Sequence, residues 1–88
     1  MANKRDLKKD INFVLGDLIE EVYVREATNS DINSTEANAI VDEAIATFDS
    51  LMNRVNQKGV ENPADHFKEV RADLQSSATK IAERINNL

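Results

Sequence analysis

Cysteine is absent from this chain of 88 residues, proline occurs once and glycine twice. Without cysteine, the chain has no disulfide bond, no thiolate metal site and no cysteine nucleophile. The two glycines, Gly16 and Gly59, stand too far apart for a phosphate-binding loop or a dinucleotide-binding fingerprint. Runs of alternating apolar and polar residues bounded by turn residues are also missing, so β-strands have little support. The sequence therefore predicts an all-α protein.

Long apolar runs are missing too, since none approaches the roughly 20 residues that span a bilayer. No apolar segment follows the charged N-terminal residues, and we expect a cytoplasmic location with no membrane partner. A composition of 41% hydrophobic and 31% charged residues is typical of a globular chain. Its length fits a single domain over residues 1–88, just above the size of roughly 70 to 80 residues at which a lone core becomes marginal.

Apolar residues recur at helical spacing along three segments, which predicts helices at about 4–26, 34–57 and 63–87. Each segment carries one apolar stripe that requires a covering neighbour. In the first, Leu15 and Ile19 are expected to widen a central stripe, whose members are Leu7, Ile11, Val14, Leu18 and Val22. The stripe of the second is Ala37, Val41, Ala44, Phe48, Leu51 and Val55, and that of the third is Phe67, Val70, Leu74, Ala78, Ile81, Ile85 and Leu88.

Short polar residues mark the expected helix starts. Asn3 is a weak candidate cap for the first helix, and Asn33 or Ser34 caps the second. If Asn33 is the cap, Glu36 stands where a capping box places its acid. The third start is the clearest, because Asn62 precedes a proline at the first helical position.

The end of the second helix is expected beside Gly59, in the left-handed conformation just after the helix. Similar helix lengths and short loops then favour an up-down-up antiparallel three-helix bundle. The alternative architecture splits the first helix at Gly16 and has four shorter helices, because a glycine inside a helix costs about 1 kcal/mol relative to alanine.

Catalytic chemistry has few candidates here. His66 is the only histidine, and no strained nucleophile turn is present. With Asp65, Glu69 and Asp73 it flanks one strip of the third helix, which permits the alternative of a metal-binding helical protein. A solvated acidic face explains the same pattern more simply. We therefore expect no enzyme, no catalytic or metal residues and no cofactor.

The first helix has apolar residues on two sides. Phe13 and Val24, three full turns apart, lie behind its main stripe, and Tyr23 lies on a shoulder in the same row as Gly16. A three-helix bundle covers one broad stripe per helix and leaves the far side of this one open. These residues are either ordinary exposed apolar side chains or an interface.

Protein contact, through a homodimer or as a small adaptor, is accordingly the expected function. Phe13, Gly16, Tyr23 and Val24 are the expected interface residues, and Ile45 with Met52 is a weaker hint on the second helix, where filling of the core is the simpler reading. The alternative is a small regulator that contacts nucleic acid or another anion through Lys4, Arg5, Lys8 and Lys9. Nucleic-acid binding is disfavoured by the net charge of −5, because phosphates meet a repulsive mean field.

Overall fold

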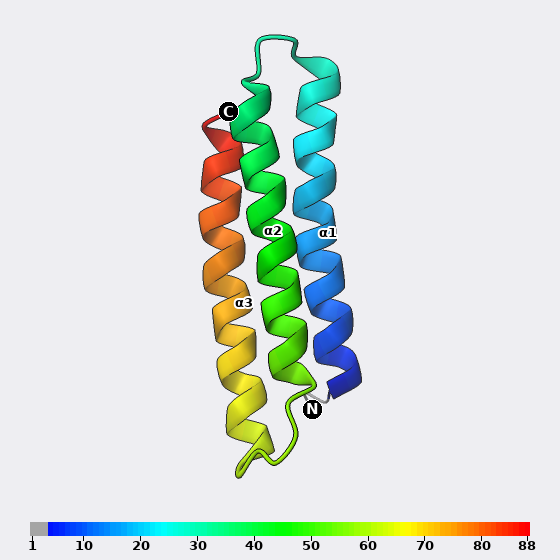
Figure 1. Ribbon diagram of the computed structural model, residues 1–88, viewed down its shortest axis with the longest axis vertical. Coiled ribbons are helices and arrows are strands. Elements are labelled where there is room, and N and C mark those ends of the chain that lie inside the picture. Colours follow the sequence, from blue (N-terminus) through cyan, green and yellow to red (C-terminus); the bar gives the residue numbers. More distant parts are fainter. Residues whose placement is uncertain (1–3) are drawn as a thin grey trace.

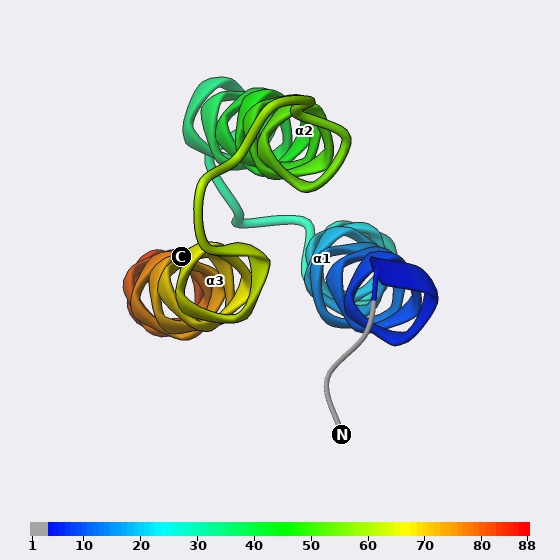
Figure 2. The same cartoon turned by 90° about the horizontal axis from the view of Figure 1, so that it is seen from below.

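The computed structural model describes residues 4–88, and Figure 1 shows three helices side by side. Helix α1 spans Lys4–Thr28, α2 spans Ser34–Val55 and α3 spans Pro63–Asn86. The chain runs up, down and up, so α2 is antiparallel to both neighbours. Seen from the end, the helices occupy the corners of a triangle (Figure 2), and all three pairs are in contact. The predicted all-α three-helix bundle is confirmed.

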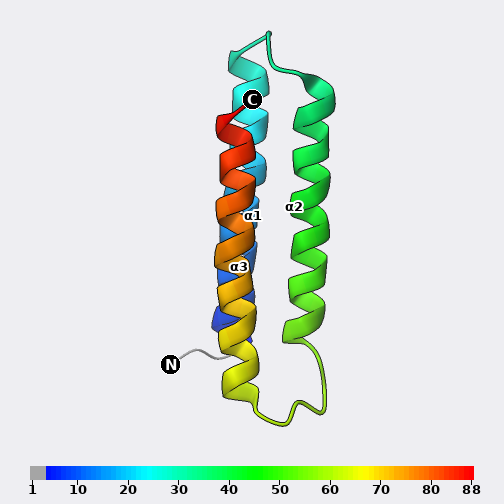
Figure 3. The same ribbon diagram turned by 90° about the vertical axis from the view of Figure 1, so that its left-hand side faces the viewer.

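The bundle is a rod of 49 × 20 × 16 Å with one apolar core along its axis. In Figure 3, α3 overlaps α1 and α2 stands beside them, and in the triangular arrangement of Figure 2 every helix keeps one side toward solvent. Among the described residues, no polar or charged side chain is buried. The buried side chains are Leu7, Ile11, Leu15, Val22, Ala37, Ile40, Val41, Ala44, Leu51, Val55, Val70, Leu74, Ile81 and Ile85.

Helix α1 is continuous through Gly16, so the alternative with four shorter helices is wrong. The residue just before this glycine, Leu15, is fully buried, as is Val22 two turns later. Burial of the apolar stripe on both sides of Gly16 outweighs the cost of about 1 kcal/mol for one glycine.

The centre of the α1 stripe differs from the prediction. Leu15, expected at the margin, is fully buried, whereas Val14 and Leu18 are only partly buried. The reason is that α1 packs more extensively on α2 than on α3, which turns the centre of its buried stripe toward α2. Periodicity along one helix defines a face but does not say toward which neighbour that face turns.

Helix ends differ from the prediction by one or two residues. α1 continues to Thr28, whose hydroxyl donates to the Val24 carbonyl at 2.9 Å, and Asn29 N–H donates to the Arg25 carbonyl at 2.9 Å. α2 ends at Val55, two residues early, and α3 ends one residue early at Asn86. Gly59 has a φ of 73°, which is the left-handed conformation that was predicted. It lies farther along the loop, however, and not directly after the C-cap Asn56.

The start of α2 is capped by Asn33, whose side-chain oxygen accepts from Glu36 N–H at 3.1 Å. The Glu36 carboxylate accepts from Arg84 of α3, so only one arm of the predicted capping box forms. Asn3, the cap predicted for α1, lies outside the described residues.

Asn62 caps α3 as predicted. Its side-chain oxygen accepts from Asp65 N–H at 3.3 Å, its amide donates to the Asp65 carboxylate at 3.0 Å, and Pro63 follows as the first helical residue. Asn62→Ala is therefore expected to lower the free energy of unfolding by about 0.5–2 kcal/mol in urea denaturation. The control Asn53→Ala, at an exposed position inside α2, should leave stability unchanged or slightly higher. Equal losses in both variants would contradict the capping role.

Candidate interaction surface

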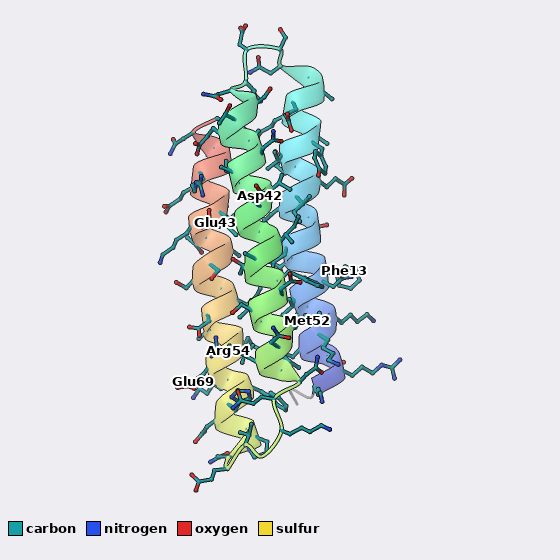
Figure 4. All side chains as sticks on the ribbon, viewed as in Figure 1. Phe13, Asp42, Glu43, Met52, Arg54 and Glu69 are labelled. Atoms are coloured by element: carbon teal, nitrogen blue, oxygen red, sulfur yellow. The ribbon has the colours of Figure 1, made fainter. Side chains whose placement is uncertain are left out.

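Large apolar side chains remain exposed on one side of the bundle. Phe13 and Tyr23 are each 56% exposed, Val24 is 49% exposed, and Ile45 of α2 is 47% exposed. Figure 4 shows the Phe13 ring projecting from α1 away from the other two helices. The side of α1 opposite its buried stripe is therefore partly apolar, as the spacing of apolar residues predicted.

We call this side the α1 outer face and define it by exposed residues only. Its members are Arg5, Asp6, Lys9, Asn12, Phe13, Gly16, Asp17, Glu20, Tyr23, Val24 and Ala27. All four predicted interface residues belong to it, and they share one helix. On the helical wheel, Gly16 and Tyr23 lie toward α2, while Phe13 and Val24 lie on the opposite margin.

A groove of about 210 Å³ borders this face, between α1 and α2. It is mainly apolar, and its lining residues are Asn12, Leu15, Gly16, Ile19, Ile45 and Phe48. A Cβ atom built on Gly16 would meet nothing within 4 Å. The glycine is thus not required by any close contact within the described residues, although it costs helix stability.

Two residues of the groove were not expected there. Ile45 was expected to fill the core, but its side chain is about half exposed, and Phe48 of the predicted stripe is only partly buried. Met52 does pack against the core as expected. The breadth of the apolar arc on α2 was the one available signal for Ile45. It did not reveal that α1 presents a glycine beside that isoleucine.

Charges on α1 are separated along its length. The part before Gly16 carries four basic residues and two acidic ones, whereas the part after it carries four acidic residues and one basic one. Asp10 is directed to α3, where Arg71 donates to its carboxylate at 2.6 Å. Of the basic cluster predicted as an anion contact, Lys4, Arg5 and Lys9 are exposed and Lys8 is half-buried. The outer face is therefore basic near the N-terminal end of α1 and acidic toward the C-terminal end.

His66 has a structural role that the sequence did not reveal. Its Nε2 lies 2.5 Å from the Arg54 carbonyl oxygen, near the end of α2. A carbonyl oxygen only accepts, so Nε2 carries the proton of this hydrogen bond. The Arg54 carbonyl also accepts from Gln57 N–H at 3.3 Å, so the imidazole adds a second donor there and ties the start of α3 to the end of α2.

The other predicted metal candidates turn to different partners. Asp65 binds the cap residue Asn62, and Asp73 accepts from the Arg54 guanidinium at 2.5 Å. Figure 4 places Glu69 on the side of α3 away from α2. Within residues 4–88, no three histidine, cysteine or acidic side chains are arranged to hold a metal ion.

Arg84 of α3 forms salt bridges with two acidic residues of α2. Its guanidinium donates to Glu36 at 2.9 Å and also to Glu43. The hydrogen bond to Glu36 raises the pKa of Arg84 above its ordinary value. A second groove, of about 450 Å³ between α2 and α3, is lined by Glu43 and by the Arg54–Asp73 pair. The charges of these pairs are already engaged across the two helices.

The fold and these contacts define a small all-α bundle with one partly apolar outer face. Comparisons with family models, with curated proteins and with solved structures found no match. Among the helices described, none combines the length and apolar character needed to cross a membrane.

Proposed function

We propose that this chain is a non-enzymatic helical bundle that works by protein contact through the α1 outer face, with a second copy of itself as the partner. The observation that carries the proposal is the exposure of Phe13 and Tyr23 on the helix where Gly16 leaves open space. Aromatic side chains supply large contact areas and are enriched in protein interfaces.

Scattered apolar residues on a surface need no partner, so their arrangement decides the argument. Here the exposed apolar side chains gather on α1 and on the adjoining edge of α2, around the groove beside Gly16. The α2–α3 side is instead bridged by ion pairs. The α1 outer face combines aromatic rings with an apolar groove, and Gly16 has no side chain to obstruct a neighbour. Such a surface is suited to pack against a helix.

Chain length also favours self-association. A core confined to the axis of a thin rod stabilises the fold only modestly, since small domains bury a smaller fraction of their surface. Pairing of two copies adds buried apolar area without lengthening the chain, and a symmetric dimer is the commonest oligomer. A different protein as the partner, which would make the chain an adaptor, is the competing outcome.

Equilibrium sedimentation at tens of micromolar tests the proposal, since weak self-association is detected in this range. The wild type should approach twice the mass of the 9.8 kDa chain. Phe13→Glu should remain monomeric, because it would bury a charge without a partner.

The matched control is Ser76→Glu, which adds the same charge at an exposed position of α3 and should still dimerise. A monomeric wild type, or a Phe13→Glu variant that associates as strongly as the wild type, overturns the proposal.

A further inference from the structure

We propose that two copies of this chain pair through α1 in antiparallel orientation, with the twofold axis beside Gly16. This inference rests on the protein contact proposed above and specifies its geometry. Gly16 is the midpoint of α1, which spans Lys4–Thr28. Two antiparallel copies centred on this residue can therefore overlap along the whole helix, about 37 Å at 1.5 Å per residue.

The spacing of exposed residues has the symmetry that such a pair needs. One strip of the outer face follows separations of four, three, four, four, three and four residues, and its members are Arg5, Lys9, Asn12, Gly16, Glu20, Tyr23 and Ala27. Mixed steps of three and four residues keep a strip on one side of a helix. Because the order of steps is the same from either end, an antiparallel copy presents matching positions. Lys9 then lies opposite Tyr23 of the second copy, and Asn12 lies opposite Glu20.

Such a crossing gives Gly16 a physical role that no contact within the single subunit gives it. Inside α1 it lowers helix stability by about 1 kcal/mol relative to alanine, and a Cβ there would touch nothing within 4 Å. The distance between two packed helices depends on the side chains where they meet. Two glycines at the crossing let the backbones approach closely, and Phe13 of each copy then packs over the segment around Gly16 and Glu20 of the other.

Charge selects both the partner and the orientation. In an antiparallel pair, the basic part of each α1 lies along the acidic part of the other, whereas a parallel pair sets like charges together. Lys9 can approach both the Tyr23 ring and the Glu20 carboxylate of the second copy. Arg5 faces the last turn of the other helix, where the carbonyl groups favour a cation. A surface that complements itself in this way fits a second copy of the same chain.

Distances between spin labels test the orientation, and the lack of cysteine makes single-cysteine labelling specific. Arg5→Cys and Ala27→Cys are each labelled and measured by double electron–electron resonance. Both positions are eleven residues from Gly16, so the two label pairs in an antiparallel dimer should be separated by about 33 Å along the axis. Equal distances in the two variants are the signature of a twofold axis at this glycine.

Other outcomes separate the orientation from the contact itself. Short distances in both variants mean a parallel pair, and a long distance in one with a short one in the other means a displaced axis; either result overturns this inference while the dimer stands. Adding Phe13→Glu to Ala27→Cys should abolish the distance peak. Sedimentation can also show that both labelled proteins are monomers under conditions where the wild type is a dimer. In that case the contact depends on the two ends of α1, where the labels lie, and the proposed crossing at its centre is wrong. A monomeric wild type removes the contact and the orientation together.

Discussion

Leu15→Ala is expected to lower the free energy of unfolding by about 2–5 kcal/mol, whereas Phe13→Ala, two residues earlier, should change it by less than about 0.5 kcal/mol. Leu15 is fully buried, so its truncation removes apolar contacts and leaves a cavity in the core. The Phe13 ring is more than half exposed and has little contact to lose within one subunit. Small domains have a total stability of only about 5–15 kcal/mol, so the first change is severe.

Urea denaturation followed by circular dichroism measures both variants. The protein should be kept near 1 μM, about tenfold or more below the range proposed for self-association, so that stability of the single subunit is compared. Ile81→Ala is a second core variant, on α3, and should resemble Leu15→Ala. If Phe13→Ala lowers the free energy of unfolding as much as Leu15→Ala does, the ring is packed inside the subunit. Phe13 then cannot belong to the proposed interface.

Gly16→Leu is expected to act in opposite directions on the subunit and on the dimer. Leucine is a far better helix former than glycine, so the free energy of unfolding of the single subunit should rise by about 1 kcal/mol. No atom within 4 Å of the new Cβ opposes this gain. At the crossing of two α1 helices, the same side chain would hold the backbones apart. The dissociation constant should therefore rise at least about tenfold, equivalent to about 1.4 kcal/mol.

Gly59→Leu is the matched control for this second prediction. Its position has a φ of 73°, which costs a residue with a side chain about 1–2 kcal/mol, so the subunit should become less stable. It lies in the loop between α2 and α3, away from the α1 outer face, and self-association at concentrations where the subunit stays folded should persist. Denaturation at low concentration and sedimentation at high concentration separate the two effects. A Gly16→Leu variant that dimerises normally would contradict a crossing at Gly16.

The starts of α2 and α3 were predictable from the sequence because each depends on a hydrogen bond within four residues. Asn33 and Asn62 accept from backbone N–H groups three positions ahead, as their places in the sequence indicated. Helix ends were less predictable, since partners from other segments contribute. The carbonyl of Arg54, near the end of α2, accepts a hydrogen bond from the His66 side chain of α3. Nothing in either segment alone indicates that pairing.

The candidate surface was predictable in part. Phe13 and Val24 lie so far around the helical wheel from the main stripe that no rotation of α1 could bury both sides. The exposure of Ile45 depended instead on how α2 is turned toward its neighbours. The exchange in burial between Leu15 and Val14 depended likewise on how α1 is turned, because residues at the edges of a stripe are covered or left open by small rotations.

By itself, the sequence determined three helices, the capped starts of α2 and α3 and an α1 with apolar residues on two sides, because spacing at 3.6 residues per turn and local hydrogen bonds act within one segment. Tertiary structure decided which stripe residues became core, that Gly16 and Ile45 border one groove, and that Arg84 bridges Glu36 and Glu43. The physical reason is that these features depend on the direction in which each helix faces its neighbours. That direction results from the packing of all three helices together, which no single segment encodes.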